Sequence, residues 1–278
     1  MCGRYVTIKT IQEIEKRYNV TANMLDHFTA NINVSVGQYA PVITNNDPKQ
    51  LQLFQFGMTP HWAKKKMYLF NARSEGNFNK ENNPDYTGAK GILQKPSFRR
   101  PIRSQRCLVI ADAFIEGSKE KRLNEPFLIY PNDREGRFSL AGIWDEWTNK
   151  ETGEVCRSFS IITTTANDLL QRVGHHRSPV VLQGEEESIW IDSNADVSDI
   201  TSLLKPFNAK NFNAYPISSG IRSPKAVDST LLKPIGPTIY PEFDYVIYED
   251  LTLFGMGESP ARKRRQKSDE DEKKNDNK

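Results

Sequence analysis

The chain has 278 residues, of which 37% are hydrophobic and 26% charged, a composition typical of folded globular domains. Its net charge of +3 comes entirely from the residues after Ala261, because the rest carries equal numbers of acidic and basic side chains. These values argue against a globally basic nucleic-acid-binding domain, and the absence of apolar runs near ~18 residues argues against membrane-spanning segments.

Apolar spacing and β-branched runs predict a mixture of helices and strands. Helices are expected over residues 10–19, 185–192 and 197–205. Strands are expected over residues 51–58, 106–114, 125–131, 137–144, 157–167 and 243–254. The segment between Asn77 and Pro101 has few core-forming runs, so we expect a long surface loop. This order predicts an α+β fold around a strongly curved, mostly antiparallel sheet.

The C-terminal end differs in composition from the body. Residues 259–278 are rich in charge and nearly devoid of apolar side chains, so we expect a disordered tail after a single domain over 1–258. The tail contains RKRR (262–265), a basic cluster typical of nuclear localisation signals. This predicts a nuclear protein, with the cytoplasm as the alternative.

Two basic stretches contain interleaved aromatic residues. QKPSFRRPIRSQR (94–106) has five cations and no acid, and HWAKKK (61–66) places Trp62 beside three lysines. Phosphate contacts combined with stacking are what single-stranded nucleic acid requires. The alternative is that both stretches are solvated loops, as charge runs often are.

The chain opens with MCGRY, in which a cysteine follows the initiator methionine. If Met1 is removed, Cys2 carries an α-amine with a pKa near ~7.7–8.0 and a thiol with a pKa near ~8.5. Such a 1,2-aminothiol condenses with an aldehyde, first to an imine and then to a thiazolidine ring. Alternatively, Cys2 has no role. Cys2, Cys107 and Cys156 form neither a disulfide framework nor a metal motif, and a reducing compartment is expected.

Other polar residues stand beside predicted strands. Glu116 follows a buried run, Asn71 and Arg73 lie in NARSE, and His175 lies in GHHRSPVVL. Each also has an ordinary structural interpretation as a cap, a turn residue or a loop histidine. Their spacing alone does not establish contact between them.

Six motifs in order resemble the SRAP family (SOS response-associated peptidase). They are MCGRY, NARSE, RCLVIADAFIEG, LAGIWDEW, IITTTAN and GHHRSPVVL. The resemblance implies a single SRAP-like domain with a barrel-like core and flanking helices. It also implies a sensor of abasic sites in single-stranded DNA that crosslinks to them through the N-terminal cysteine. We expect a eukaryotic member of the family.

The resemblance implies a role for each catalytic residue. Cys2 matches the nucleophile, and Asn71 matches the asparagine that orients the terminal amine. Glu116 matches the glutamate that moves protons during sugar opening and imine formation. His175 matches the histidine beside the sugar, and an ordinary pKa near ~6.5 would suit proton transfer at neutral pH.

Five further residues match positions of the family's DNA interface. Arg4, Arg73 and Arg177 match phosphate contacts. Thr164 matches a threonine that supports the site, and Trp62 matches an aromatic residue near the flanking bases.

The sequence departs from the family pattern at a few positions. Gly117 replaces a tryptophan after the catalytic glutamate, and Ile115 replaces a tyrosine before it. Val36 replaces a proline, and Ser178 replaces a methionine. The four residues that match catalytic positions are all present. The resemblance therefore supports the proposed chemistry more strongly than it supports a given affinity for DNA.

Three functions remain open from the sequence. The first is covalent capture of abasic sites, a lyase-type activity with slow reversal. The second is a thiol peptidase, or autopeptidase, that uses Cys2 as nucleophile, a hydrolase activity. The third is a non-covalent single-stranded DNA-binding module. We expect no cofactor, no metal and no membrane partner, and a monomer.

Overall fold

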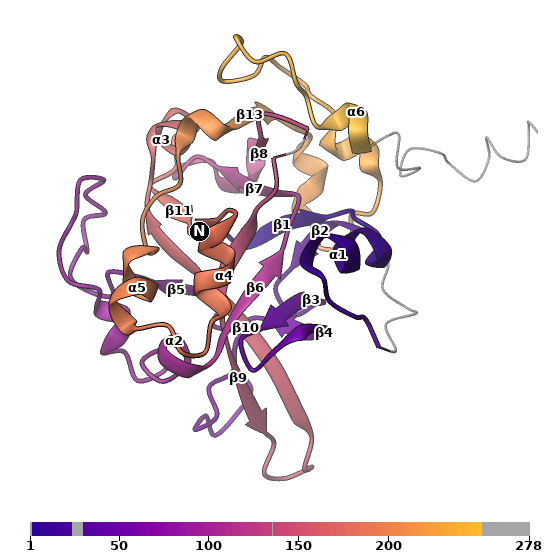
Figure 1. Cartoon of the computed structure of the whole chain (residues 1–278). Helices are drawn as coiled ribbons and strands as arrows, with labels where there is room; N and C mark the ends of the chain where they lie inside the picture. The colour runs from indigo at the N-terminus through magenta and orange to yellow at the C-terminus, as the bar shows by residue number, and fades with distance from the viewer. Residues whose placement is uncertain (1, 24–29, 135, 252–278) are drawn as a thin grey trace, which may run out of the picture.

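Two β-sheets form the body of the protein, with short helices around them (Figure 1). The computed structural model describes residues 2–23, 30–134 and 136–251. The architecture confirms the predicted α+β class.

The first sheet has five antiparallel strands in the order β13-β8-β7-β1-β2. They are β1 (Arg4–Thr7), β2 (Asn31–Ser35), β7 (Ala113–Gly117), β8 (Pro126–Pro131) and β13 (Phe212–Pro216). Tyr5 lies opposite both Val34 and Phe114, so the N-terminal strand is inserted between two others. This pairing fixes the segment that directly follows Cys2.

The second sheet is mixed and closes on itself. Its strands are β3 (Tyr39–Thr44), β4 (Asp47–Phe56), β5 (Asn71–Arg73), β6 (Arg106–Ile110), β9 (Ser139–Thr148), β10 (Val155–Thr165), β11 (Arg177–Pro179) and β12 (Val181–Leu182). Strand β10 pairs with β9 on one side and, in parallel, with β4 and β5 on the other. The pairings β10-β4-β3-β6-β9 thus return to β10, which gives the barrel-like core that was expected.

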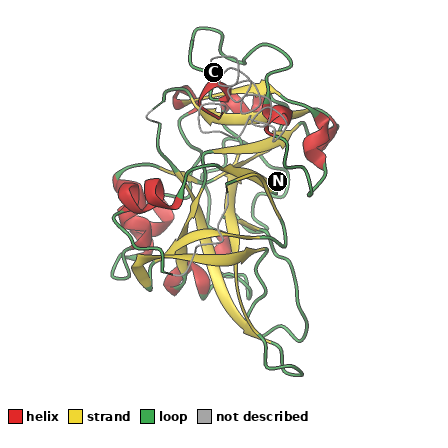
Figure 2. Cartoon of the chain, turned by 90° about the vertical axis from the view of Figure 1, so that its right-hand side faces the viewer, coloured by secondary structure: helices red, strands yellow, loops and turns green. Residues whose placement is uncertain are grey.

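Helices are short and lie at the periphery of the sheets (Figure 2). They are α1 (Ile11–Tyr18), α2 (Pro101–Ser104), α3 (Asp168–Arg172), α4 (Glu185–Ile191), α5 (Val197–Ser202) and α6 (Tyr248–Leu251). Single 3-10 turns are η1 (Gly91–Leu93), η2 (Arg122–Asn124), η3 (Ala209–Asn211), η4 (Ser219–Arg222) and η5 (Ser229–Leu232). Within the described ranges, every helix is too short or too polar to cross a lipid bilayer.

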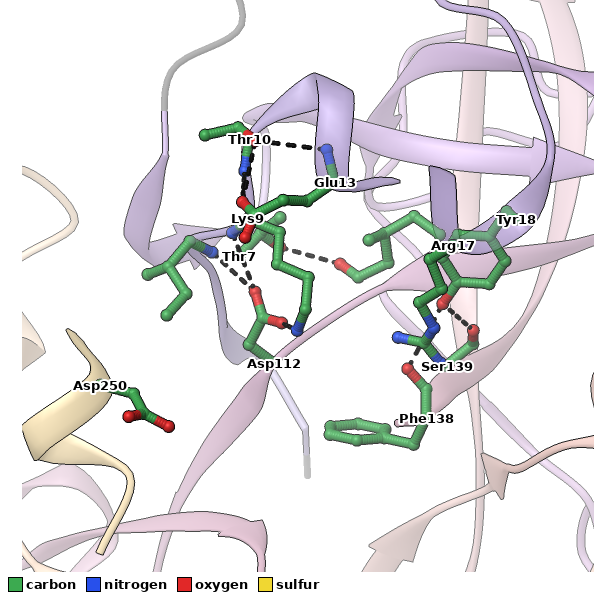
Figure 3. Close-up of polar contacts among 12 residues, drawn as sticks. Thr7, Lys9, Thr10, Glu13, Arg17, Tyr18, Asp112, Phe138, Ser139 and Asp250 are labelled. Atoms are coloured by element: carbon green, nitrogen blue, oxygen red, sulfur yellow. Dashed lines mark hydrogen bonds and ion pairs between the residues drawn. The ribbon is translucent and has the colours of Figure 1, made fainter. Parts of the chain in front are cut away.

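Polar contacts anchor the chain between β1 and α1 (Figure 3). The Asp112 carboxylate accepts hydrogen bonds from the backbone amides of Ile8 and Lys9, at 2.8 and 3.2 Å, and pairs with the Lys9 ammonium. Thr10 and Glu13 form a capping box, in which each side chain accepts from the other's amide. The helix predicted over 10–19 is confirmed, and its start is locked to the end of β1.

The apolar core between the sheets contains Cys2 itself. One cluster joins Cys2 and Tyr5 to Phe114 of the first sheet and to Phe56 and Phe159 of the second. Burial of this apolar surface stabilises the contact between the sheets at roughly 25 cal/mol per Å². Cys2 is therefore part of the core.

The predicted strands over 51–58, 125–131, 137–144 and 157–167 are confirmed with shifted ends, as are the helices over 185–192 and 197–205. The strand expected over 106–114 is two strands, because the chain leaves the second sheet at Ile110 and enters the first at Ala113. Residues 77–101 are largely irregular, as expected, apart from η1.

The late strand expected over 243–254 is wrong within its described part. Residues Tyr248–Leu251 form α6 instead. Ile247 and Leu251 are both buried, and their spacing of four residues is helical rather than strand-like. The predicted tail 259–278 lies outside the described residues, and the domain boundary at 258 stays a prediction.

Candidate functional site

Cys2 is held by an asparagine from the second sheet. The Asn71 amide donates a 2.9 Å hydrogen bond to the Cys2 carbonyl and a 3.0 Å bond to the Phe70 carbonyl. Asn71 begins β5, whose parallel pairing with β10 fixes its position. Cys2 is 1% exposed. The structure thus brings together two residues that are 69 positions apart in the sequence.

A carboxylate–imidazole pair lies at the end of β7. Glu116 Oε2 is 3.5 Å from Nε2 of His175, and both side chains are buried. His175 Nδ1 is 2.7 Å from the Gly117 carbonyl. Because a carbonyl oxygen only accepts, Nδ1 carries a proton and Nε2 faces Glu116. This arrangement sets two groups that can carry or accept a proton side by side.

Burial changes the acid–base properties of His175 and of Cys2. Desolvation lowers the pKa of His175, although the Glu116 charge opposes this effect. The ordinary histidine pKa that the sequence suggested is therefore too high. Desolvation and the Glu116 charge raise the pKa of the Cys2 thiol well above its usual range. The thiol is accordingly protonated at rest. We call Cys2, Asn71, Glu116 and His175 the inner cluster.

A cavity of about 830 Å³ opens beside the inner cluster. Its lining includes Gly3, Phe70, Glu116, His175 and His176, together with cationic side chains treated separately. This volume lies within the range of ~300–1,000 Å³ found for small-molecule sites. The cavity therefore has room for a sugar with an attached phosphate.

Two predicted DNA contacts lie at accessible positions. Arg4 lines the cavity, and its guanidinium donates to Asn33 at 2.8 Å and to Ser35 at 2.9 Å. Trp62 is 50% exposed. Both placements are compatible with contact to a DNA strand, which stays a prediction.

The other three predicted contacts lie deeper. Arg177 is 2% exposed, and its guanidinium makes two hydrogen bonds to the Glu75 carboxylate, at 3.1 and 2.9 Å. Thr164 is also buried and donates to Glu75 at 3.5 Å. Arg73 is partly exposed and donates to the Asn79 carbonyl. A phosphate contact by Arg177 would require that the pair with Glu75 opens first.

The basic stretch 94–106 is less uniform than its sequence suggests. Arg106 is fully buried, and its guanidinium donates to the carbonyls of Trp190 and Asp192, at 2.7 and 2.6 Å. Arg99, Arg100 and Arg103 remain exposed. The interpretation of the whole stretch as one cationic surface is therefore wrong at Arg106.

Sequence reasoning missed three cations that line the cavity, namely Lys119, Arg122 and Arg222. The first two lie in a charge-mixed segment directly after Glu116. The third lies about a hundred residues further along, outside every motif. For Lys119 and Arg122, the sequence offered one indication that they lie at the site: they are close to the motif that contains Glu116.

Comparison with known proteins gives a consistent answer. The family model of SOS response associated peptidase (SRAP) matches residues 1–224. Abasic site processing protein YoqW of Bacillus subtilis is 30% identical over 81% of this chain and 96% of its own length. Abasic site processing protein HMCES of Pongo abelii is 27% identical over 73% of this chain and 60% of its own length.

A solved structure agrees with this result. A protein from Bacteroides thetaiotaomicron covers 84% of this chain and 100% of its own, with 28% identity and a TM-score of 0.71. Because the bacterial relatives match at higher identity and coverage, the comparisons do not support the expected eukaryotic origin. The nuclear localisation remains an untested prediction. The extent of the family match and of the structural similarity establishes that the chain belongs to the SRAP family.

Proposed function

We propose that this protein processes abasic sites in single-stranded DNA by covalent capture through Cys2. The observation that carries the proposal is the hydrogen bond from Asn71 to the Cys2 carbonyl, which holds the N-terminal residue near the Glu116–His175 pair. The names of the relatives, abasic site processing proteins, support the substrate class.

The proposed reaction starts from the ring-opened abasic sugar. After removal of Met1, the α-amine of Cys2 attacks the C1′ aldehyde carbon to give a carbinolamine. Loss of water gives an imine. The Cys2 sulfur then adds to the imine carbon, and its proton passes to the nitrogen, which closes a thiazolidine. One water leaves in all, and nothing is oxidised or reduced.

The Glu116–His175 pair supplies the proton transfers that this sequence needs. Opening of the sugar requires a proton on the ring oxygen and removal of one from the hydroxyl at C1′. Dehydration of the carbinolamine also requires an acid. Positioned acid–base groups contribute typically ~10²–10⁴-fold to such steps. The low-dielectric surroundings of both residues strengthen the effect.

The state of the thiol favours this reaction over the peptidase alternative. A cysteine peptidase needs a thiolate, which low pKa values provide. Here burial and Glu116 raise the pKa of Cys2, so the resting thiol is a poor nucleophile. In the capture reaction the amine attacks first, and the sulfur adds later to a far more reactive imine. Removal of Met1 by the chain itself remains the hydrolase alternative.

A denaturing gel tests the proposal. Protein whose mass shows loss of Met1 is mixed with a single-stranded oligonucleotide bearing one abasic site. We expect a heat-stable shifted band, absent for the undamaged oligonucleotide and for Cys2→Ala. The intact mass should equal protein plus DNA minus one water.

Two controls separate the steps. Cys2→Ala keeps an α-amine without a thiol, so borohydride should trap its imine as a stable adduct. A protein that retains Met1 has no 1,2-aminothiol, so it should give no thiazolidine and no heat-stable band without borohydride. A missing wild-type band from correctly trimmed protein would rule out covalent capture and leave the peptidase or the non-covalent module.

A further inference from the structure

A glycine at the end of β7 determines the shape of one side of the cavity. A Cβ at Gly117 would lie 1.7 Å from the Arg122 carbonyl oxygen and 2.5 Å from its carbon. No other residue fits there unless this backbone moves. The segment after Gly117 therefore folds back against β7, and Arg122 adopts a left-handed conformation with φ of 51°. The family's tryptophan at this position is incompatible with such a close approach.

The folded-back segment places cations on the cavity lining. Lys119 and Arg122 belong to it, and both side chains are exposed. Arg222 joins them from η4, where its guanidinium donates to the Asn124 side chain. We call Lys119, Arg122 and Arg222 the cationic wall. Within the described ranges no ion pair is recorded for any of the three, whereas the adjacent Lys121 pairs with Glu125.

The cavity as a whole is electropositive. Four cationic side chains line it, counting Arg4, against the single carboxylate of Glu116. The two histidines add no charge at neutral pH, since burial and His175 lower the pKa of His176 to about 4. A concave surface lined by one sign of charge concentrates counter-ions of the opposite sign. The expected occupant of the wall is therefore an anion.

We propose that the cationic wall binds a phosphodiester that adjoins the abasic sugar. This inference rests on the proposed function, because an abasic nucleotide carries a phosphate on each side of the sugar whose C1′ must reach Cys2. A sugar held at Glu116 and His175 projects one of these phosphates across the cavity. Lysine and arginine contacts to phosphate position a strand without reading its bases. The wall thus selects an aldehyde within a DNA strand over a free aldehyde of the same size.

Non-covalent binding tests the wall separately from the chemistry. In a Cys2→Ala background, the affinity for a strand with a tetrahydrofuran abasic analogue is measured by fluorescence anisotropy at several salt concentrations. The variants are Lys119→Gln, Arg222→Gln and Arg122→Asn, because asparagine tolerates a positive φ. Lys49→Gln, an exposed lysine of β4 away from the cavity lining, is the matched control.

Each wall variant should weaken binding about two- to fivefold, as expected for exposed charge pairs. It should also reduce the slope of log affinity against log salt by about 0.7, the value per phosphate contact on single strands. Lys119→Arg and Lys49→Gln should leave the slope unchanged. Circular dichroism confirms that the variants fold. Wild-type slopes in all three folded variants would overturn the inference.

A neutral linkage locates the phosphate. A methylphosphonate replaces the phosphate on the 5′ or the 3′ side of the analogue, or one several nucleotides away. Replacement of one of the two adjoining phosphates should abolish the difference in affinity between wild type and the wall variants. Replacement of the distant phosphate should preserve that difference. Persistence of the full difference with both adjoining linkages neutral would overturn the inference. A wall effect in protein that fails to crosslink would reject only covalent capture.

Discussion

The inner cluster, of which Glu116 and His175 line the cavity, and the cationic wall on the same cavity are built differently. Cys2, Glu116 and His175 are buried and held by short contacts to backbone and side chains. The wall side chains are exposed and lie on 3-10 turns or loops. Rigid, desolvated groups suit bond making, whereas exposed cations suit reversible attraction of a charged strand. From this difference we expect that the rate of crosslinking and the affinity for the DNA strand can be altered separately in this protein.

The largest expected effect is on stability, at the buried Glu75–Arg177 pair. Glu75→Gln leaves the buried Arg177 guanidinium without its charge partner, so we expect the free energy of unfolding to fall by ~3–5 kcal/mol. Urea unfolding measures the loss. The double variant Glu75→Gln/Arg177→Met should recover much of it, because no uncompensated charge remains. A loss below ~1 kcal/mol in the single variant would contradict the structural role of this pair.

The next effect separates chemistry from binding. Glu116→Gln should slow crosslinking at saturating DNA by ~10²–10⁴-fold, because the amide cannot exchange a proton with the substrate. The affinity for the tetrahydrofuran strand should stay within about twofold, since Glu116 makes no attractive contact with phosphate. Quenched-flow or hand-quenched gels give the rate. An unchanged rate would remove Glu116 from the mechanism.

A smaller effect is expected at the asparagine that holds the terminus. Asn71→Ala removes the hydrogen bond to the Cys2 carbonyl, so the α-amine is less well oriented. We expect crosslinking to slow by ~10–100-fold, in line with the cost of misplacing a reacting group by about 1 Å. Asn71→Asp keeps an oxygen but loses the donor, and should be no faster. A wild-type rate in the alanine variant would show that β1 alone positions Cys2.

The smallest effect concerns acidity. The pKa of His176 is about 4 in the folded protein, against ~6.5 unfolded, so between these values the unfolded chain binds more protons. Stability is therefore full above pH ~6.5 and falls as the pH drops toward 4. His176 is partly exposed, so we expect only ~1 kcal/mol from it after solvent screening. His176→Asn should flatten the pH dependence of urea unfolding by this amount, and an unchanged profile would contradict the assignment.

Much of the fold was predictable because hydrophobic patterning is local. The capped helix at Ile11–Tyr18 and the long strands β9 and β10 follow from such patterns. The short strands β1 and β2 were not predicted, because four or five residues carry too little periodicity and their pairing partners are distant. Ring closure through the parallel β4-β10 pairing likewise depends on non-local contacts.

The residues of the site could be predicted where they lie in motifs that resemble the SRAP family. Outside those motifs, little in the sequence indicated them. The structure brings Asn71 to Cys2 and Glu116 to His175, contacts that spacing alone did not reveal. Burial of Arg106 and of Arg177 was not foreseeable, since a sequence shows charge but not depth. Arg222 reaches the cavity only through the fold.

The insertion of β1 between β2 and β7 has a consequence for biosynthesis. Strand β1 leaves the ribosome before its pairing partner Phe114, which follows more than a hundred residues later. At about 5–20 residues per second, β1 waits on the order of ten seconds before it can pair with β7. Removal of Met1 by a cellular aminopeptidase has this interval in which to act. Slower trimming would leave the nitrogen of the buried Cys2 in a peptide bond, so the folded protein would lack its reactive amine.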